Sequence, residues 1–485
     1  MEAADRNPRS LVGRAWKLVR TGIRRSLRRF GARDRTQVVE ERPRRSMRSF
    51  WHRREFLRAV GSGGLLSALG LSARSALGAP APASRGETIG AGRGFAAGPL
   101  RRPSGAGAVE GNIYERLLGI RPTINAAGPL SRYGASLMPP EVTGAMTEAS
   151  HHFVDLDELN RTVGRRIAEI MNAEAAMVTS GAFGALKLGA AACLTGSDPE
   201  RMAQLPAPTW LRRECLIQTA HTFVYDRAYT DAGMKLVPVE TDTEMRAAIG
   251  ERTAMIAGLA NVERWNRPGV LLPEDLVAIG REGDVPVLID AAAEVPPASN
   301  LTYFTEIGVD LVAISGGKGL RGPSSTGILA GRADLVEAAQ LQASPNARIG
   351  RGMKVDKEEM IGLLVALERF VELDHAAVAR EERRKAAFIA AQLADVAGLD
   401  AVYDEALAGG VGVILRWDEG RTGFTAGKLV ESLAAGDPPV VLWTFEILNY
   451  TGEPTVYTSQ LPDGDEIRVA RRLRQVFTAR LNDDG

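Results

Sequence analysis

The stretch "VDLVAISGGKGLRGPSSTGILAG", residues 309–331, places one lysine between glycines directly after an apolar run. The run 309–315 is typical of a buried strand. Lys318 is unusual in this position, because its ammonium group has to be solvated or paired and lysine is rarely used for packing. The plain alternative is a solvated loop lysine. The stretch therefore calls for a chemical explanation that the rest of the chain has to support.

Short apolar runs alternate with helical patterns through the body of the chain. This alternation predicts an α/β fold with a mostly parallel sheet of seven strands, covered by helices on both faces. The last two strands are joined by too few residues for a crossover helix, so we predict that this pair is antiparallel. The predicted strands are 175–180, 214–219, 234–240, 253–260, 285–290, 309–315 and 325–332.

A smaller C-terminal α/β lobe is predicted from about residue 340. Its pattern begins with one long helix over 357–396 and ends with an amphipathic helix over 464–481, whose apolar side we interpret as a packing face. Between them, strands are predicted at 411–417, 438–445 and 454–459.

Polar residues follow the predicted strands at the carboxyl ends, where open α/β sheets bind their ligands. Ser180, Gly181 and Ala182 follow the first strand and open a helix, a place where free backbone N–H groups favour a phosphate. When these residues are taken alone, an ordinary helix start is the favoured explanation. Asp290 ends the fifth strand, where an isolated aspartate is often a helix cap or a turn residue.

The lysine stretch is not a nucleotide-binding P-loop. Val312 stands where that motif requires its first glycine, and Gly319 follows the lysine in place of Ser or Thr. A phosphate cradle, a carboxylate and a strand-end lysine together fit pyridoxal phosphate, because the lysine forms a Schiff base and the aspartate keeps the ring nitrogen protonated. Each of these three elements is a weak indication of a pyridoxal phosphate site when taken alone. Their order along one alternating strand and helix pattern is a much stronger one.

Six stretches carry a resemblance to a known family: "INAAGPLSRYGASLMPPEV" (124–142), "FVDLDELNRTVGRRIAEI" (153–170), "AAMVTSGAFGAL" (175–186), "VLIDAAAEVPP" (287–297), "DLVAISGGKGLRGPSSTGILAG" (310–331) and "GRGMKVDKEEMIGLLVALE" (350–368). From about residue 111 to the C-terminus the chain resembles the fold type I pyridoxal-phosphate enzymes. Within them it is similar to the group that contains L-seryl-tRNA selenium transferase and D-glucosaminate-6-phosphate ammonia-lyase, and more so to the ammonia-lyase branch.

The resemblance implies a PLP-transferase-like fold and assigns roles to the cofactor residues. Lys318 would form the internal aldimine, Asp290 would pair with the pyridinium, and His221 would stack on the ring. A partly buried structural histidine is the alternative for His221. The residues that would hold the phosphate are Thr179, Ser180, Gly181, Ala182 and Ser315.

Arginines in or beside the matching stretches are the candidates for binding a substrate carboxylate or phosphate, because the guanidinium fork is bidentate. We rank Arg321 and Arg348 first and Arg132 and Arg351 after them. Ser324 stands where the family pattern has a glutamine, and this departure concerns the substrate more than the cofactor.

The resemblance implies an enzyme that acts on a small amino substrate, either an amino acid or an amino sugar acid. β-Elimination followed by loss of ammonia is the expected reaction. An aminotransferase or a selenium-transferase-like activity would use the same residues, and a non-catalytic exported binder is a further alternative. The resemblance also implies a homodimer or a higher homo-oligomer, with the active site at a subunit interface.

The first 85 residues form a basic leader. The chain has 60 Lys and Arg against 59 Asp and Glu, of which 20 and 6 lie in residues 1–85, leaving 40 and 53 for residues 86–485. Such an acidic body argues against a nucleic-acid partner. Arg53 and Arg54, followed by a Gly- and Ala-rich apolar run, resemble a twin-arginine export signal; the run is too weak for a stable membrane span. Translation from Met47 would give this signal a usual length.

The expected organisation is therefore a leader (1–85), a Gly- and Pro-rich linker (86–110), an N-terminal segment with the large cofactor-binding domain (111–339) and a small C-terminal domain (340–485). The leader predicts export to the periplasm or another extracytoplasmic space. No metal site is expected. Cys193 and Cys215 lie in apolar surroundings and are predicted to be buried thiols.

Overall fold

A computed structural model describes residues 112–485 apart from 261, 263–267, 408–409, 445–451 and 482–485. The described elements all belong to one compact unit, Gly105–Gly485. The predicted leader, with Met47 and the arginine pair, lies outside the described residues, so it stays a prediction, as do the domain boundaries. No helix in the described part of the chain is both long and apolar enough to cross a membrane.

The central feature is a seven-stranded sheet with the order β2-β8-β7-β6-β5-β3-β4. The pairs among β7, β6, β5, β3 and β4 are parallel, and β8 runs antiparallel to both of its neighbours. This confirms the predicted mostly parallel sheet and the antiparallel last pair. The strands are β2 (Ala175–Ser180), β3 (Glu214–Gln218), β4 (Lys235–Val239), β5 (Thr253–Leu259), β6 (Val287–Asp290), β7 (Leu311–Ser315) and β8 (Thr326–Gly331).

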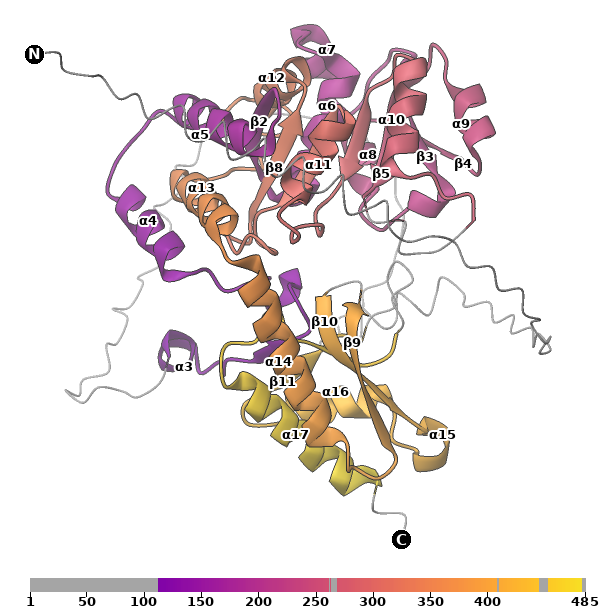
Figure 1. Cartoon of the computed structure of the whole chain (residues 1–485). Helices are drawn as coiled ribbons and strands as arrows, with labels where there is room; N and C mark the ends of the chain where they lie inside the picture. Colours follow the sequence, from indigo (N-terminus) through magenta and orange to yellow (C-terminus); the bar gives the residue numbers. More distant parts are fainter. Residues whose placement is uncertain (1–111, 261, 263–267, 408–409, 445–451, 482–485) are drawn as a thin grey trace, which may run out of the picture. The chain divides into compact units, whose positions relative to one another are not determined.

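Both faces are buried over most of the sheet, because most strand positions are apolar; the edge strand β4 is the exception and is largely exposed or partly buried. Along β5, for example, Ile256 packs into the apolar cluster on one face, while Met255 and Ala257 pack into the cluster on the other. The first cluster contains residues of α5 (Leu156–Met171), α9 (Asp242–Ala248), α10 (Pro273–Glu282), α11 (Asn300–Ile307) and α13 (Lys357–Glu372). The second contains residues of α6 (Gly181–Thr195), α8 (Arg227–Ala232) and α12 (Ala333–Gln342). Figure 1 shows these helices around the sheet.

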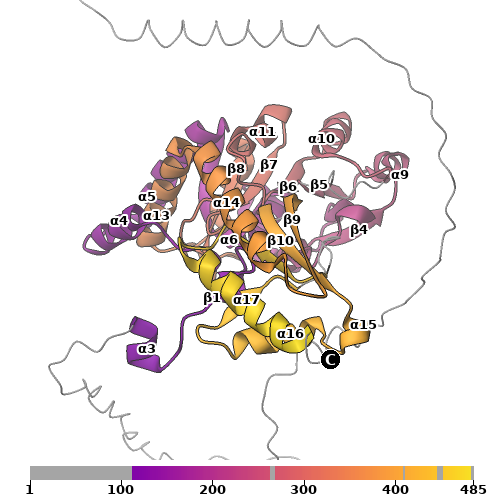
Figure 2. The same cartoon turned by 60° about the horizontal axis from the view of Figure 1, so that its bottom comes forward.

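The C-terminal lobe is built on a three-stranded antiparallel sheet, β12-β10-β9. Helix α14 packs on β9 and β10, and α17 packs on α14 (Figures 1 and 2). A separate parallel pair joins β1 of the N-terminal segment to β11 of the lobe. The elements are β1 (Ile124–Ala126), α14 (His375–Leu393), β9 (Leu399–Leu407), β10 (Gly410–Trp417), α15 (Glu419–Thr422), α16 (Ala426–Ala434), β11 (Val440–Leu442), β12 (Thr455–Tyr457) and α17 (Asp465–Leu481).

Five further elements complete the described fold. These are α3 (Ile113–Leu118), α4 (Pro140–Ser150), α7 (Pro199–Gln204) and the 3-10 turns η2 (Ser131–Tyr133) and η3 (Thr219–His221).

Two features of the C-terminal lobe differ from the prediction. The single helix expected over 357–396 is two helices, because the chain leaves helical geometry at Leu373 and Asp374 caps the next helix by accepting a hydrogen bond from the Ala377 N–H. Strand β9 was not predicted. Its residues are only partly buried or exposed, so the apolar alternation that marks a half-buried strand is weak.

Helix α5 lies so close to β2 that only glycine fits at one position. A Cβ on Gly164 would lie 2.0 Å from the carbonyl oxygen of Ala176. Gly164→Ala is therefore expected to lower the free energy of unfolding by about 2 kcal/mol, because α5 would have to move off the sheet. Chemical denaturation of the purified protein measures this change.

Gly144→Ala is the matched control, because Gly144 lies in α4 and nothing stands within 4 Å of its Cβ position. Here the free energy of unfolding should rise by about 0.5–1 kcal/mol. Equal effects of the two substitutions would contradict the packing of α5 on β2.

Candidate active site

The lysine loop is the tight turn 316–322 between β7 and β8. A Cβ on Gly319 would lie 1.9 Å from the Val295 carbonyl oxygen, and one on Gly316 would lie 2.1 Å from Thr326 Oγ1. A Cβ on Gly317 would lie 2.4 Å from the Ser324 Cα. The glycines around Lys318 are therefore required by the close approach of neighbouring backbone and side chains, and they fix where the lysine stands.

Asp290 lies on the strand next to the lysine loop. β6 and β7 are parallel neighbours, with Asp290 paired in register to Ala313, so the aspartate and Lys318 both follow the carboxyl edge of the sheet. Among the described residues the carboxylate of Asp290 has one hydrogen bond, which Oδ1 accepts from the Ala292 N–H at 3.0 Å. The second carboxylate oxygen remains for a further donor.

Burial and neighbouring charges shift the pKa values of Lys318 and Asp290 in opposite directions. Burial lowers the pKa of Lys318, and the charges of Asp290 and Glu294 partly oppose that shift. Burial raises the pKa of Asp290, which the Ala292 N–H and the charge of Lys318 oppose. A lysine with a lowered pKa is a better nucleophile and base near neutral pH than an ordinary one.

The predicted phosphate cradle is assembled by strand register. Thr179 and Ser315 both pair with Gly327 of β8, so the ends of β2 and β7 lie on either side of one strand. A Cβ on Gly327 would lie 2.4 Å from the backbone of Gly181, which brings β8 against the start of α6. The Thr179 hydroxyl donates to the Gly181 carbonyl at 3.0 Å.

The amino end of α6 has backbone donors to spare. Ser180 is its N-cap residue but makes no side-chain capping bond, and Gly181 has a left-handed φ of 68°. Uncapped N–H groups and the helix dipole favour an anion. With the second oxygen of Asp290 and the pKa-lowered Lys318, this donor set fits pyridoxal phosphate.

His221 is fully buried and both ring nitrogens bond to backbone. Nδ1 accepts from the Leu259 N–H at 2.9 Å, so the Nε2 at 2.8 Å from the Leu271 carbonyl oxygen is the protonated donor. Burial lowers the pKa of His221 to about 4, although the bond to Leu271 opposes the shift. A role for His221 as acid or base does not fit these bonds, which are those of the structural alternative. Stacking on the cofactor ring stays a prediction.

The four arginines lie in three places. Arg321 belongs to the lysine loop, and its Nη2 donates to the Ser459 carbonyl of the C-terminal lobe at 3.3 Å. Arg348 and Arg351 lie on the turn after α12, which reaches α6 because Met353 Sδ stands 3.9 Å from the Cβ position of Gly184. Arg132 is exposed in η2. Their roles toward a substrate stay predictions.

Two further residues of this region were not singled out from the sequence. Ser136 donates from Oγ to the Gly317 carbonyl at 2.7 Å and so ties the N-terminal segment, with Arg132, to the lysine loop. Asp226 accepts a hydrogen bond from the Phe223 N–H at 2.9 Å. Burial raises the pKa of Asp226 to about 6, and the charge of Asp290 adds to the shift. The only signal in the sequence is that Asp226 lies five residues after His221, in the stretch "HTFVYDRAY" (221–229).

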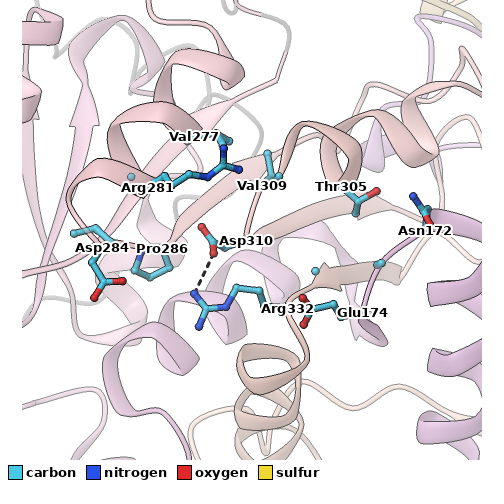
Figure 3. Close-up of a pocket in the computed structure, with 15 residues that line it drawn as sticks. Asn172, Glu174, Val277, Arg281, Asp284, Pro286, Thr305, Val309, Asp310 and Arg332 are labelled. Carbon is cyan, nitrogen blue, oxygen red and sulfur yellow. Dashed lines mark hydrogen bonds and ion pairs between the residues drawn. The ribbon is translucent and has the colours of Figure 1, made fainter.

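Figure 3 shows a pocket of about 360 Å³ that lies at the opposite, amino edge of β2, β6 and β7. Its walls include Glu174, Arg281, Asp310 and Arg332, and none of the predicted site residues. Arg332 pairs with Asp310 at 3.1 Å, and Asp310 accepts from the Val287 N–H at 2.8 Å. These bonds link strands at the amino edge.

No group of three or more His, Cys, Asp or Glu side chains is placed to hold a metal ion in the part of the chain that the structure describes. Both cysteines are free thiols, Cys215 buried and Cys193 partly so, and burial raises the pKa of each.

Known proteins are similar to this chain in sequence and in fold. Residues 238–413 match the model of the family Aminotransferase class-V. The chain is 33% identical over 374 residues to a Streptomyces sp protein named 5'-C-glycyluridine monooxygenase-decarboxylase, covering 74% of this chain and 91% of that one. It is 27% identical over 376 residues to the D-glucosaminate-6-phosphate ammonia lyase of Salmonella typhimurium, covering 75% and 98%.

A solved structure of D-glucosaminate-6-phosphate ammonia-lyase superposes with a TM-score of 0.66 at 26% identity, covering 77% of this chain and all of that one. The fold type I architecture and the pyridoxal phosphate cofactor expected from the sequence are confirmed. The decarboxylase relative was not anticipated.

Lys318→Ala is expected to abolish covalent attachment of the cofactor, because Lys318 is the amine that the loop presents beside Asp290. Borohydride reduction of the cofactor-loaded wild type should fix pyridoxal phosphate on the peptide that contains Lys318, as detected by mass spectrometry. The control Lys354→Ala, at an exposed lysine, should be labelled like the wild type. A label on any other lysine would contradict the assignment.

The buried His221 predicts a stability loss in acid. Its pKa in the folded state, about 4, lies below the ordinary value of 6.5, so the unfolded chain binds the proton more tightly and stability falls as the pH drops from about 6.5 to 4. The loss reaches about 3 kcal/mol below pH 4. His221→Gln, which cannot titrate, should show a smaller fall in unfolding free energy over this window. Parallel curves for the two proteins would refute the buried neutral ring.

Proposed function

We propose, from the premise that the chain belongs to the aminotransferase class-V family, that it removes ammonia from a β-hydroxy amino acid or amino sugar acid by β-elimination. The observation that carries the proposal is the partly buried Lys318, which has a lowered pKa and is held by a crowded glycine loop beside Asp290. The named activity of the ammonia-lyase relative, 27% identical over nearly its full length, supports this choice.

Different residues of the chain would bind the cofactor and transfer protons. Bound pyridoxal phosphate supplies an electron sink for the α-carbon of an amino substrate. The α6 amino end and Ser315 would hold its phosphate, and Asp290 would keep the ring nitrogen protonated. Lys318 would accept the α-proton of the bound substrate at Nζ and would return a proton to the departing β-hydroxyl group, which leaves as water. Water then replaces the amine, leaving a 2-oxo acid and ammonia.

Arginine side chains would hold the substrate's anionic group. Arg321 is partly buried, and burial lowers its pKa without removing its charge at neutral pH. It therefore offers a desolvated cation three residues from Lys318, and Arg348 is the second candidate.

A second candidate function is oxidative decarboxylation of an amino acid. The observation that favours it is the 33% identity to the monooxygenase-decarboxylase, the higher identity of the two relatives. The same lysine and aspartate would serve this reaction, so the products decide between the two.

The test incubates the cofactor-loaded protein with D-glucosaminate and measures ammonia, 2-oxo acid, oxygen uptake and carbon dioxide. Equal amounts of ammonia and 2-oxo acid without oxygen uptake are expected. Lys318→Ala should reduce turnover by about a thousandfold or more. Oxygen uptake with carbon dioxide release would favour the second candidate, and 2-oxo acid without free ammonia would indicate transamination. A protein that takes up no cofactor would be a binder.

We also propose export by the twin-arginine route and assembly as a homodimer or larger oligomer. The basic leader supports export. Several apolar side chains of the N-terminal segment, among them Leu117 and Phe153, are exposed in the single chain and support assembly. Cell fractionation and size-exclusion chromatography test these points; a cytoplasmic monomer would refute both.

A further inference from the structure

Arg321 has an unusual backbone at the junction between the lysine loop and the C-terminal lobe. It is a non-glycine residue with a left-handed φ of 59°, held by its N–H bond to the Lys318 carbonyl at 3.1 Å. Such a conformation costs about 1 kcal/mol and persists where the surroundings impose it, commonly at functional sites. It directs the side chain to the Ser459 carbonyl of the lobe.

Glu382, a carboxylate of the lobe, is close enough to Arg321 for the charge of each to shift the pKa of the other. It lies on α14, is partly buried, and its backbone carbonyl accepts from the Thr458 hydroxyl at 3.0 Å. Among the described residues its carboxylate has neither a hydrogen bond nor an ion pair. Burial raises the pKa of Glu382, and the charge of Arg321 opposes that shift. A partly buried, unpaired carboxylate weakens a fold unless a ligand uses it.

Gln460 gives an independent sign of an absent partner. It follows Ser459 directly and is 7% exposed, yet its Oε1 has no hydrogen-bond donor in the described part of the chain. Buried polar atoms are nearly always satisfied, so an orphaned acceptor here needs an explanation.

We infer that Glu382 and Gln460, beside Arg321, form a specificity subsite that binds hydroxyl groups on the substrate while Arg321 binds its carboxylate. The inference rests on the proposed function, since it concerns the substrate of the same site. Both unsatisfied groups present oxygen acceptors, and the arginine presents donors. A polyhydroxylated amino acid supplies the complementary set, and an alkyl amino acid of equal length supplies only the carboxylate.

The test compares two six-carbon amino acids, D-glucosaminate and D-norleucine, which differ in their hydroxyl groups. Dissociation constants come from the change in cofactor absorbance as each is added to the cofactor-loaded enzyme. The wild type should bind D-glucosaminate at least about tenfold more tightly. Glu382→Ala should weaken D-glucosaminate about tenfold and leave D-norleucine unchanged, whereas Arg321→Ala should weaken both.

Glu381→Ala is the matched control, because Glu381 is the neighbouring carboxylate on α14 and pairs with Arg384 at the surface. It should change neither constant. Glu382→Gln should keep or raise the melting temperature, since it removes a buried charge without a partner; a clear fall would assign Glu382 a structural role and overturn the inference.

Two further results separate the inference from the proposed function. Equal affinities for the two amino acids, in the wild type and in Glu382→Ala alike, would overturn the subsite and leave the lyase proposal standing. No absorbance change with either amino acid would overturn both.

Discussion

The crowding of backbone around Lys318 is the constraint on which the site depends. A Cβ atom on any of three loop glycines would lie only 1.9–2.4 Å from an atom of Val295, Ser324 or Thr326. These contacts come from two segments, the stretch that follows β6 and the residues that lead into β8, so the loop cannot shift without moving both. The lysine is therefore held in a fixed position next to Asp290. A nucleophile needs such a rigid support because its reacting atom has to be placed accurately.

Much of the large sheet could be predicted from the sequence, because its strands are buried on both faces and read as continuous apolar runs. The residues at the strand ends could be placed for the same reason, since parallel strands bring their carboxyl ends to one edge. Lys318 and Asp290 follow directly from that rule. Thr179 and Ser315 are less direct, since their shared pairing with Gly327 depends on register, which no local pattern encodes.

The remaining features depend on contacts between distant segments. The bond from Ser136 to Gly317 spans 181 residues, and that from Arg321 to Ser459 spans 138. Helix α14 begins anew at Asp374 although apolar periodicity continues through the break, so only the cap residue marks it. His221 also depends on distant contacts. From the sequence it could be either a ring that stacks on the cofactor or a structural histidine. Its two ring nitrogens are hydrogen-bonded to the backbone of Leu259 and Leu271, which does not fit a role in proton transfer.

The pairing of β1 with β11 has a consequence for how the molecule is made. Ile124 of β1 lies beside Val440 of β11. β1 therefore stays unpaired until β11 has been synthesised, more than 300 residues later. Such a distant pairing is slow to close, because the intervening chain has to be ordered first. The cofactor-binding sheet is complete by residue 331, well before that moment. The large sheet can thus form during translation, while the junction that carries Arg321, Glu382 and Gln460 forms only after residue 460 has been made, so the finished site depends on the C-terminal lobe.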